Sequence, residues 1–439
     1  MTSHNDSNKD GILLIRGGRV VDPSSERDGE FDVLIDGGRI VRVAKNLPPP
    51  SGASVLEAKG CIVAPGLVDL CVHLREPGNE GAENIETGTR AAAAGGVTSV
   101  VAMPDTDPLT DEESSVQFLL RRAAETACVR VWPAGALTMG EAPDRLSELG
   151  AMAKAGAVAA SDSGQSIPSS LLLRRALEYA KVFDLPVFLG LEDRSLAPDG
   201  MMNEGPLSTR LGHRGVPRQS ESIALARVLA LAELTGARLV LGPITTRQGV
   251  ERIRDAKRRE LPVVCWTAPH YFTLTDEAVV EHGSMAKVRP PLREADDREA
   301  LLRALADGII DAVASDHAPQ GRSAKEQEFS AAPFGMIGLE TLLPLVVTRL
   351  VEPGHLSWLE AIRRLSTSPA QLLKLPAGTL ADGAPADIVV IDPSEERKIS
   401  AFSSKSRNSP FLGATLRGFP QAVLVGGHVV LRREALKTA

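Results

Sequence analysis

The first strand of the predicted fold is Gly66-Leu67-Val68-Asp69-Leu70-Cys71-Val72-His73-Leu74-Arg75-Glu76-Pro77-Gly78, which begins apolar and ends in polar residues. Pro-Gly pairs bound it, so the polar residues lie where strand becomes loop. Cys71 and His73 are two positions apart, and on a strand such residues point to the same side. A cysteine and a histidine on one side of a strand end are half of the ligands of a zinc site.

Strand-like and helical segments alternate from residue 65 onward. Apolar, β-branched runs recur at 66–73, 97–103, 129–135, 156–161, 186–191, 238–243, 262–267 and 309–315. Helical patterns follow at about 86–94, 111–127, 141–154, 169–183, 219–236, 247–259, 297–307 and 338–350. Buried strands alternating with helices indicate a parallel sheet, and eight such units favour a closed barrel. The sequence therefore predicts an α/β protein with a (β/α)8 TIM barrel over residues 65–375.

Both ends of the chain are strand-rich. Residues 11–64 contain short strands such as 12–15 and 19–21, and a hairpin turn at Gly37-Gly38. Strand character returns after a last helical stretch at 358–374. We expect residues 11–64 and 376–433 to form one small β-sandwich, and residues 1–10, which are polar, to be a disordered leader.

Composition excludes several classes of function. The net charge is −7 and no block of lysine and arginine occurs, which argues against a nucleic-acid or membrane-surface partner. The four cysteines are scattered without a CxxC pair, as in proteins of a reducing compartment. No apolar run approaches the ~20 residues that span a bilayer. We expect a soluble, cytoplasmic protein.

In a barrel of this kind, functional residues lie at the carboxyl ends of the strands. The first strand ends in Cys71, His73 and Arg75, and the eighth in Asp316. Histidine-type ligands on the first strand and an aspartate on the eighth form the frame of a metal-dependent amidohydrolase. In such a site the metal lowers the pKa of a bound water to about 7 and the aspartate takes its proton. Asp316 is thus the candidate catalytic base.

The chain resembles the dihydroorotases of the long bacterial type, within the amidohydrolase superfamily. The resemblance covers nearly the whole length and rests on many ordered motifs. They are Val68-Asp69-Leu70, Leu74-Arg75-Glu76-Pro77-Gly78, Ala91–Thr98, Met202-Asn203-Glu204-Gly205, Pro290-Pro291-Leu292-Arg293, Ser315-Asp316-His317-Ala318-Pro319, Ala332-Pro333-Phe334-Gly335, Gly338-Leu339-Glu340-Thr341 and Asn408–Gly413. The resemblance implies the barrel with a sandwich built from both chain ends.

The metal-binding positions of that family are altered here. The first histidine of its His-x-His-x-Arg motif is Cys71, and its histidines on the fifth and sixth strands fall on Gly190 and Gly242. Glycine supplies no ligand, so we expect that a two-metal site cannot form. Cys71, His73, Asp162 and Asp316 remain as a possible four-ligand zinc site. The alternative is that Cys71 is a buried small hydrophobe and His73 is hydrogen-bonded to Asp316. We expect His270 to pack in the core rather than bind metal.

The family's substrate-binding positions are altered as well. Arg75 is kept, whereas an asparagine of the family is Asp105, a histidine is Gln320 and a second asparagine is Arg289. A carboxylate facing a substrate carboxylate at about 4 Å costs roughly 1–4 kcal/mol, depending on the dielectric. The resemblance assigns all four positions to substrate binding, but three of them differ in this chain.

These changes suggest three functions. The first is a non-catalytic subunit of the pyrimidine pathway, because the resemblance includes inactive dihydroorotase-like chains that serve as structural partners of aspartate carbamoyltransferase. The second is an active dihydroorotase with one zinc ion, which closes N-carbamoyl-L-aspartate to dihydroorotate. The third is a cyclic amidohydrolase of altered specificity, with Asp105 and Arg289 as the changed residues. We expect no cofactor or at most one zinc ion, and an oligomer.

Overall fold

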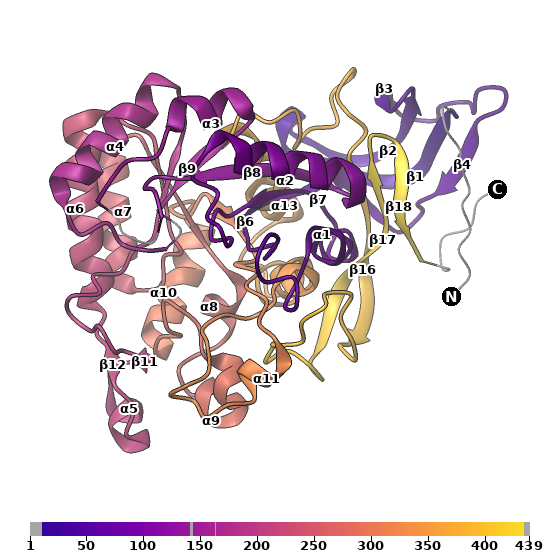
Figure 1. Cartoon of the computed structure of the whole chain (residues 1–439). Coiled ribbons are helices and arrows are strands. Elements are labelled where there is room, and N and C mark those ends of the chain that lie inside the picture. Colours follow the sequence, from indigo (N-terminus) through magenta and orange to yellow (C-terminus); the bar gives the residue numbers. More distant parts are fainter. Residues whose placement is uncertain (1–10, 141–143, 163, 434–439) are drawn as a thin grey trace.

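The computed structural model describes residues 11–140, 144–162 and 164–433, so the predicted leader at 1–10 lies outside the described residues. Figure 1 shows two parts, a barrel surrounded by helices and a β-rich unit beside it. None of the helices described is long and apolar enough to cross a membrane.

Eight parallel strands form the barrel, as predicted. Their order in the sheet is β15-β14-β13-β10-β9-β8-β7-β6. The strands are β6 (Leu67–Val72), β7 (Val97–Ala102), β8 (Arg130–Ala136), β9 (Ala159–Ser161), β10 (Val187–Leu189), β13 (Leu239–Leu241), β14 (Val263–Thr267) and β15 (Ala312–Val313). The gap between β15 and β6 is bridged beyond the end of β15, where the His73 amide donates to the His317 carbonyl (2.9 Å) and the His317 amide to the Cys71 carbonyl (3.3 Å).

Helices surround these strands mostly at the predicted positions. They are α1 (Ile85–Ala94), α2 (Glu113–Thr126), α3 (Leu149–Ala155), α4 (Ser170–Val182), α6 (Gln219–Thr235), α7 (Arg247–Arg258) and α10 (Ala295–Ala306). The helix expected at 141–154 is an exception: residues 141–143 lie outside the described part of the chain, residues 144–148 are not helical, and the helix begins only at Leu149. After β15 follow η3 (Leu339–Thr341), α12 (Leu342–Val346), η4 (Val347–Val351), α13 (Trp358–Ile362), η5 (Arg363–Thr367) and α14 (Ser368–Leu372). Local sequence explains where α1 begins. Asn84 and Thr87 form a reciprocal capping box that satisfies backbone amides at the helix start.

Short elements lie in the loops at the carboxyl ends of the strands. They are β11 (Met202–Asn203), α5 (Pro206–Leu211), β12 (Gly215–Val216), α8 (Pro269–Thr273), α9 (Ala278–His282), η2 (Gly283–Ala286) and α11 (Arg322–Lys325). The two-residue strands β11 and β12 pair with each other outside the barrel.

The second unit is one hydrogen-bonded sheet of eight strands with the path β18-β17-β16-β5-β1-β2-β3, and β4 also pairs with β1. The strands are β1 (Leu13–Asp22), β2 (Arg27–Asp36), β3 (Arg39–Ala44), β4 (Ser54–Glu57), β5 (Ile62–Pro65), β16 (Ile388–Lys398), β17 (Thr415–Val425) and β18 (His428–Arg432), with η1 (Pro23–Ser25) between β1 and β2. Both chain ends therefore build it, and Figure 1 shows indigo and yellow strands side by side. It has an apolar core of its own, separate from that of the barrel.

One expectation about this sheet was wrong. The two short strands expected at 12–15 and 19–21 form the single strand β1, which continues through Gly17-Gly18 with a shift in register. A Cβ on Gly18 would lie 2.5 Å from Val63 Cγ2, so glycine allows the strand to pass close to its neighbour there. The predicted domain boundaries at 64/65 and 375/376 stay predictions.

Candidate active site

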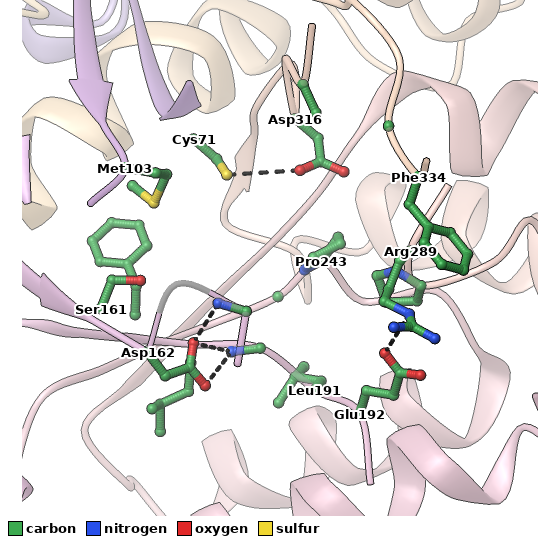
Figure 2. Close-up of a pocket in the computed structure, with 18 of the residues that line it drawn as sticks. Cys71, Met103, Ser161, Asp162, Leu191, Glu192, Pro243, Arg289, Asp316 and Phe334 are labelled. Atoms are coloured by element: carbon green, nitrogen blue, oxygen red, sulfur yellow. Dashed lines mark hydrogen bonds and ion pairs between the residues drawn. The ribbon is translucent and has the colours of Figure 1, made fainter. Parts of the chain in front are cut away.

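A cavity of about 250 Å³ opens at the carboxyl ends of the barrel strands. It has mixed apolar and charged walls, part of which Figure 2 draws. The residues that this section uses from its lining are Cys71, His73, Arg75, Asp162, Gly190, Glu192, Gly242, Trp266, Arg289, Asp316 and Phe334. The position is the one at which enzymes of this barrel class carry their active sites.

Three of the four predicted metal ligands come together in this cavity. Ligand atoms of Cys71, His73 and Asp316 all lie within 4.8 Å of one another, and they form the only such group of three among the described residues. Cys71 and His73 point to the same side of the β6 end, as their spacing predicts. Cys71 Sγ lies 3.7 Å from Asp316 Oδ1 and 3.9 Å from His73 Nε2. Thiolate, imidazole and carboxylate are all zinc ligands, so the group fits one metal ion.

Proton affinities differ within this group. Burial, together with the charges of Asp316 and Asp69, raises the pKa of the Cys71 thiol well above its ordinary value. Burial also raises the pKa of Asp316 to about 6, although the neighbouring His73 lowers it. Without a bound cation, Cys71 is therefore a neutral thiol, because its surroundings disfavour a further negative charge.

Asp162, the fourth predicted ligand, is not part of this group. Its carboxylate accepts hydrogen bonds from the backbone amides of Gly190 (3.1 Å) and Gly164 (3.0 Å), which Figure 2 shows as dashed lines. Burial raises the pKa of Asp162 to about 6 against the effect of these bonds. Asp162 thus ties the ends of β9 and β10 together.

A side chain at the sixth strand end would clash with its neighbours, whereas one at the fifth strand end would be tightly packed. A Cβ on Gly242 would lie 2.7 Å from the Cδ1, Nε1 and carbonyl oxygen of Trp266, which is buried on β14. A Cβ on Gly190 would lie 3.1 Å from the Cα of Gly164. A carbon closer than about 3.4 Å is tighter than van der Waals contact. Trp266 and the Asp162 loop therefore pack against the backbone where ligands would be needed.

Asp105 binds the two basic side chains of the first strand end. Its Oδ1 lies 2.6 Å from His73 Nδ1 and its Oδ2 lies 2.7 Å from Arg75 Nη1. Arg75 also donates through Nε to the Pro319 carbonyl (3.2 Å). Burial opposes ionisation of Asp105, but the charges and hydrogen bonds of His73 and Arg75 lower its pKa below the ordinary value. The alternative prediction, a His73–Asp316 hydrogen bond, is not among the bonds of His73, whose Nδ1 binds Asp105 and whose Nε2 contacts Cys71 Sγ.

The two other predicted substrate residues have different positions. Arg289 lines the cavity, where its Nε lies 3.2 Å from Glu192 Oε2 and its guanidinium lies 4.2 Å above the Phe334 ring. Gln320 does not line the cavity, because its side-chain amide donates to the Phe334 carbonyl (2.8 Å). Gln320 thus holds the backbone of Phe334, a residue of the cavity wall, without lining the cavity itself.

Sequence reasoning missed three contributors. Glu192 carries no motif that singles it out in the sequence, yet it is buried and pairs with Arg289. Asp69 is fully buried and accepts the amides of Cys71 and Ser315, which joins the first strand to the eighth. His317 faces the buried Glu83 (3.5 Å). Of these three residues, only Asp69 could have been recognised from the sequence, because it is an acidic residue inside an apolar strand.

His270 is buried, as expected of a packing residue, and burial lowers its pKa to about 3. Its Nε2 lies 3.6 Å from Asp316 Oδ2, so a neutral imidazole packs against that carboxylate.

Comparisons with known proteins identify the family of the chain. A family profile described as "Dihydro-orotase-like" matches residues 60–249. The dihydroorotase of Pelobacter propionicus is 47% identical over 96% of this chain and 100% of its own length, and that of Acetivibrio thermocellus is 44% identical over 97% and 100%. Among solved structures, the L-hydantoinase (dihydropyrimidinase) of Arthrobacter aurescens has a TM-score of 0.87 at 26% identity and covers 96% of each chain. A D-hydantoinase from a Bacillus sp. AR9 has a TM-score of 0.83 at 27% identity, over 97% of this chain and 96% of its own. The chain belongs to the dihydroorotase family.

Proposed function

We propose that the chain is a non-catalytic member of its family, which serves pyrimidine biosynthesis as a structural partner of aspartate carbamoyltransferase. The observation that carries the non-catalytic part is the pair Gly190 and Gly242. Neither residue has a side-chain atom that could bind a metal ion, and Trp266 occupies the space beside Gly242. A second metal ion would have no ligands from these two strand ends. The partner itself is proposed from the resemblance to inactive dihydroorotase-like subunits.

The state of Arg75 supports the same proposal. In an active relative this residue would hold the carboxylate of the substrate, whereas here Asp105 already supplies a carboxylate to it at 2.7 Å. An incoming substrate carboxylate would have to displace an internal one that is held by two basic side chains. Charge-assisted hydrogen bonds of this kind are among the stronger ones in proteins, so the displacement is costly.

A second candidate function, an active dihydroorotase with one zinc ion, has its own observation. Cys71, His73 and Asp316 converge in the cavity, and catalytic zinc sites commonly have three protein ligands. When bound, zinc would supply a water of lowered pKa. Asp105 would orient His73 through Nδ1 and leave Nε2 free to bind, a common arrangement around metal-binding histidines. Arg75 and Asp316 also have positive φ values of 62° and 52°, a conformation that clusters at active sites.

Metal analysis and an activity assay separate these candidates. The full chain, purified and incubated with zinc, is assayed for bound zinc and for dihydroorotate hydrolysis, beside Cys71→Ala and the control Cys128→Ala. We expect well below one zinc per chain and no turnover in any of the three proteins. About one zinc per chain, with turnover that only Cys71→Ala abolishes, would refute the non-catalytic proposal. Turnover of a hydantoin but not of dihydroorotate would support the third function, altered specificity.

The partner is tested separately. The chain is mixed with aspartate carbamoyltransferase of the same organism and the mixture is separated by size-exclusion chromatography. We expect one complex that contains both proteins. Separate elution of the two proteins at all concentrations would refute the structural role and leave the metal result standing.

A further inference from the structure

A second cavity lies between the barrel and the β-rich unit. Its volume is about 390 Å³, and it shares no lining residue with the cavity at the strand ends. The barrel contributes Ala94, at the end of α1, and Glu340 of η3. The β-rich unit contributes residues of β16, β17 and β18 and the segment 399–403 that follows β16. Helix α1 contacts β17, and Figure 1 shows the two next to each other. Cavities of this size at the junction of two units commonly bind small molecules. We call it the junction cavity.

The sheet side of the junction cavity is basic. Arg433 follows β18, and its Nε donates to the Pro420 carbonyl (2.9 Å). Lys398, the last residue of β16, is exposed. Neither side chain forms an ion pair with any residue that the structure describes. Burial, followed by the charge of Arg397, lowers the pKa of Arg433, so its positive charge is poorly compensated. An anion in the cavity would supply the missing counter-charge.

Arg397 offers a flat surface beside these two charges. Its guanidinium carbon lies 4.3 Å from the centre of the Phe419 ring, and its Nε donates to Glu395 Oε1 (3.1 Å). The ring and the ion pair hold the guanidinium in place, while 29% of the Arg397 side chain stays exposed. Phe402, which is half-buried, lines the same cavity. The planar rings of nucleobases stack on guanidinium and phenyl groups of this kind.

The acidic residue of the lining, Glu340, is already satisfied by the backbone. Its carboxylate accepts the amides of Ser403 (2.7 Å) and Ser404 (3.0 Å). These bonds hold the segment 399–403 against the barrel as the rim of the cavity. Burial raises the pKa of Glu340, although the two amides lower it. The cavity therefore keeps an excess of positive charge on the side of the sheet.

From the cavity, its two unpaired cations and its stacking surface we propose that the junction cavity binds a nucleoside monophosphate. A phosphate monoester carries nearly two negative charges and three acceptor oxygens, which suits Arg433 and Lys398 together. The base would lie against Arg397 and Phe402. The junction cavity is separate from the cavity at the strand ends, so the proposal holds whether or not the chain is catalytic.

The first test is a calorimetric titration of the full chain with four probes: uridine 5′-monophosphate, adenosine 5′-monophosphate, ribose 5-phosphate and inorganic phosphate. We expect at least one of the two nucleotides to bind once per chain. It should bind at least about tenfold more tightly than ribose 5-phosphate and inorganic phosphate, because these lack the base that stacks. Equal affinity for the nucleotides and ribose 5-phosphate, or no binding of either nucleotide at millimolar concentration, overturns the proposal.

The second test removes the cations that would hold the phosphate. Lys398→Met and Arg433→Met should each weaken nucleotide binding at least about tenfold. The matched control is Lys59→Met, because Lys59 is an exposed lysine of the β-rich unit outside the cavity, and it should bind as the wild type does. Circular dichroism checks that each variant is folded. Lys398 is exposed, so its variant still tests the site if Arg433→Met does not fold.

A last variant establishes which cavity the nucleotide occupies. Arg289→Met changes the cavity at the strand ends and should leave nucleotide binding as in the wild type. Binding that is lost in Arg289→Met but kept in Lys398→Met would place the nucleotide in that other cavity and overturn the proposal. Equal weakening by Lys59→Met and Lys398→Met would also overturn it, since the attraction would then come from net charge alone.

Discussion

Asp105 binds two basic side chains at once, one with each carboxylate oxygen. His73 and Arg75 are held at 2.6 and 2.7 Å, and both lie on the cavity wall. The carboxylate therefore neutralises charge that a neutral side chain at this position would leave available to a ligand. This single residue sets whether Arg75 can receive an anion from outside.

Replacing Asp105 by asparagine should make Arg75 available. An asparagine keeps the shape but carries no charge, so it competes less for Arg75 and does not repel a carboxylate. At about 4 Å a like charge costs at least about 1 kcal/mol even in a water-like dielectric, and several times more in a protein. We expect Asp105→Asn to bind N-carbamoyl-L-aspartate at least about tenfold more tightly than the wild type, as measured by calorimetry. The control is Asp107→Asn, which changes an exposed aspartate of the same loop. Equal affinities for all three proteins would contradict the role given to Asp105.

Spacing along the chain predicts some of these residue positions and not others. Cys71 and His73 share a side because alternation on a strand is local geometry. Asp162 could be placed at a strand end, but not in the ligand group, because its direction depends on the amides of Gly164 and Gly190. Trp266, which lies on the next strand, occupies the space that a side chain at position 242 would need. No pattern within one segment contains such a contact.

At the scale of elements, two buried lysines hold the segment that carries Phe334. Lys287 Nζ donates to the carbonyls of Phe329 (2.6 Å) and Ala332 (2.7 Å), and Lys325 Nζ to those of Pro333 (3.0 Å) and Gly335 (2.9 Å). Neither lysine has an acidic partner among the described residues. Hydrogen bonds to backbone carbonyls replace a counter-charge, and they fix the cavity wall on which Arg289 lies.

Lys325 should make stability depend on pH. Burial, with a smaller effect of Lys287, lowers the pKa of Lys325 to about 7, whereas an unfolded lysine titrates near 10.4. Between these values the unfolded chain binds a proton that the folded chain lacks. Lys325 therefore contributes a free energy of unfolding that increases from about pH 7 to about pH 10. Denaturant unfolding at several pH values should show this rise in the wild type relative to Lys325→Met. The exposed Lys154→Met should behave as the wild type. A constant difference between wild type and Lys325→Met would rule out the shifted pKa.

Sequence periodicity predicted most elements because each repeats a local pattern, apolar runs for strands and spaced apolar residues for helices. β1 was split in two because Gly17-Gly18 resembles a turn. Its continuation depends on pairing with β2, β4 and β5, which no local signal contains.

For the whole molecule, the decisive arrangement is a β-sheet made from both chain ends and fastened to the barrel. β5 pairs with β16, which joins residues 62–65 to residues 388–391. Arg130, the first residue of β8, makes two bonds to Asp387, from Nε to Oδ2 (2.6 Å) and from Nη2 to Oδ1 (3.0 Å). Asp387 is only 4% exposed and also accepts the amide of Gly426 (2.7 Å). One buried carboxylate thus links the barrel, β16 and the turn before β18.

Arg130→Met should test this link between the two units. It removes the charge that compensates Asp387 and leaves the buried carboxylate with the Gly426 amide. Breaking a buried ion pair costs 3–5 kcal/mol, and because Arg130 is partly exposed we expect the lower end, about 3 kcal/mol of unfolding free energy. Arg130→Met with Asp387→Asn should recover much of this loss, since no unpaired charge remains. The control is Arg19→Met, which breaks an exposed pair with Asp28 and should cost less than about 1 kcal/mol. If Arg130→Met costs no more than Arg19→Met in denaturant unfolding, the ion pair does not fasten the sheet, and the apolar contacts between the two units hold it instead.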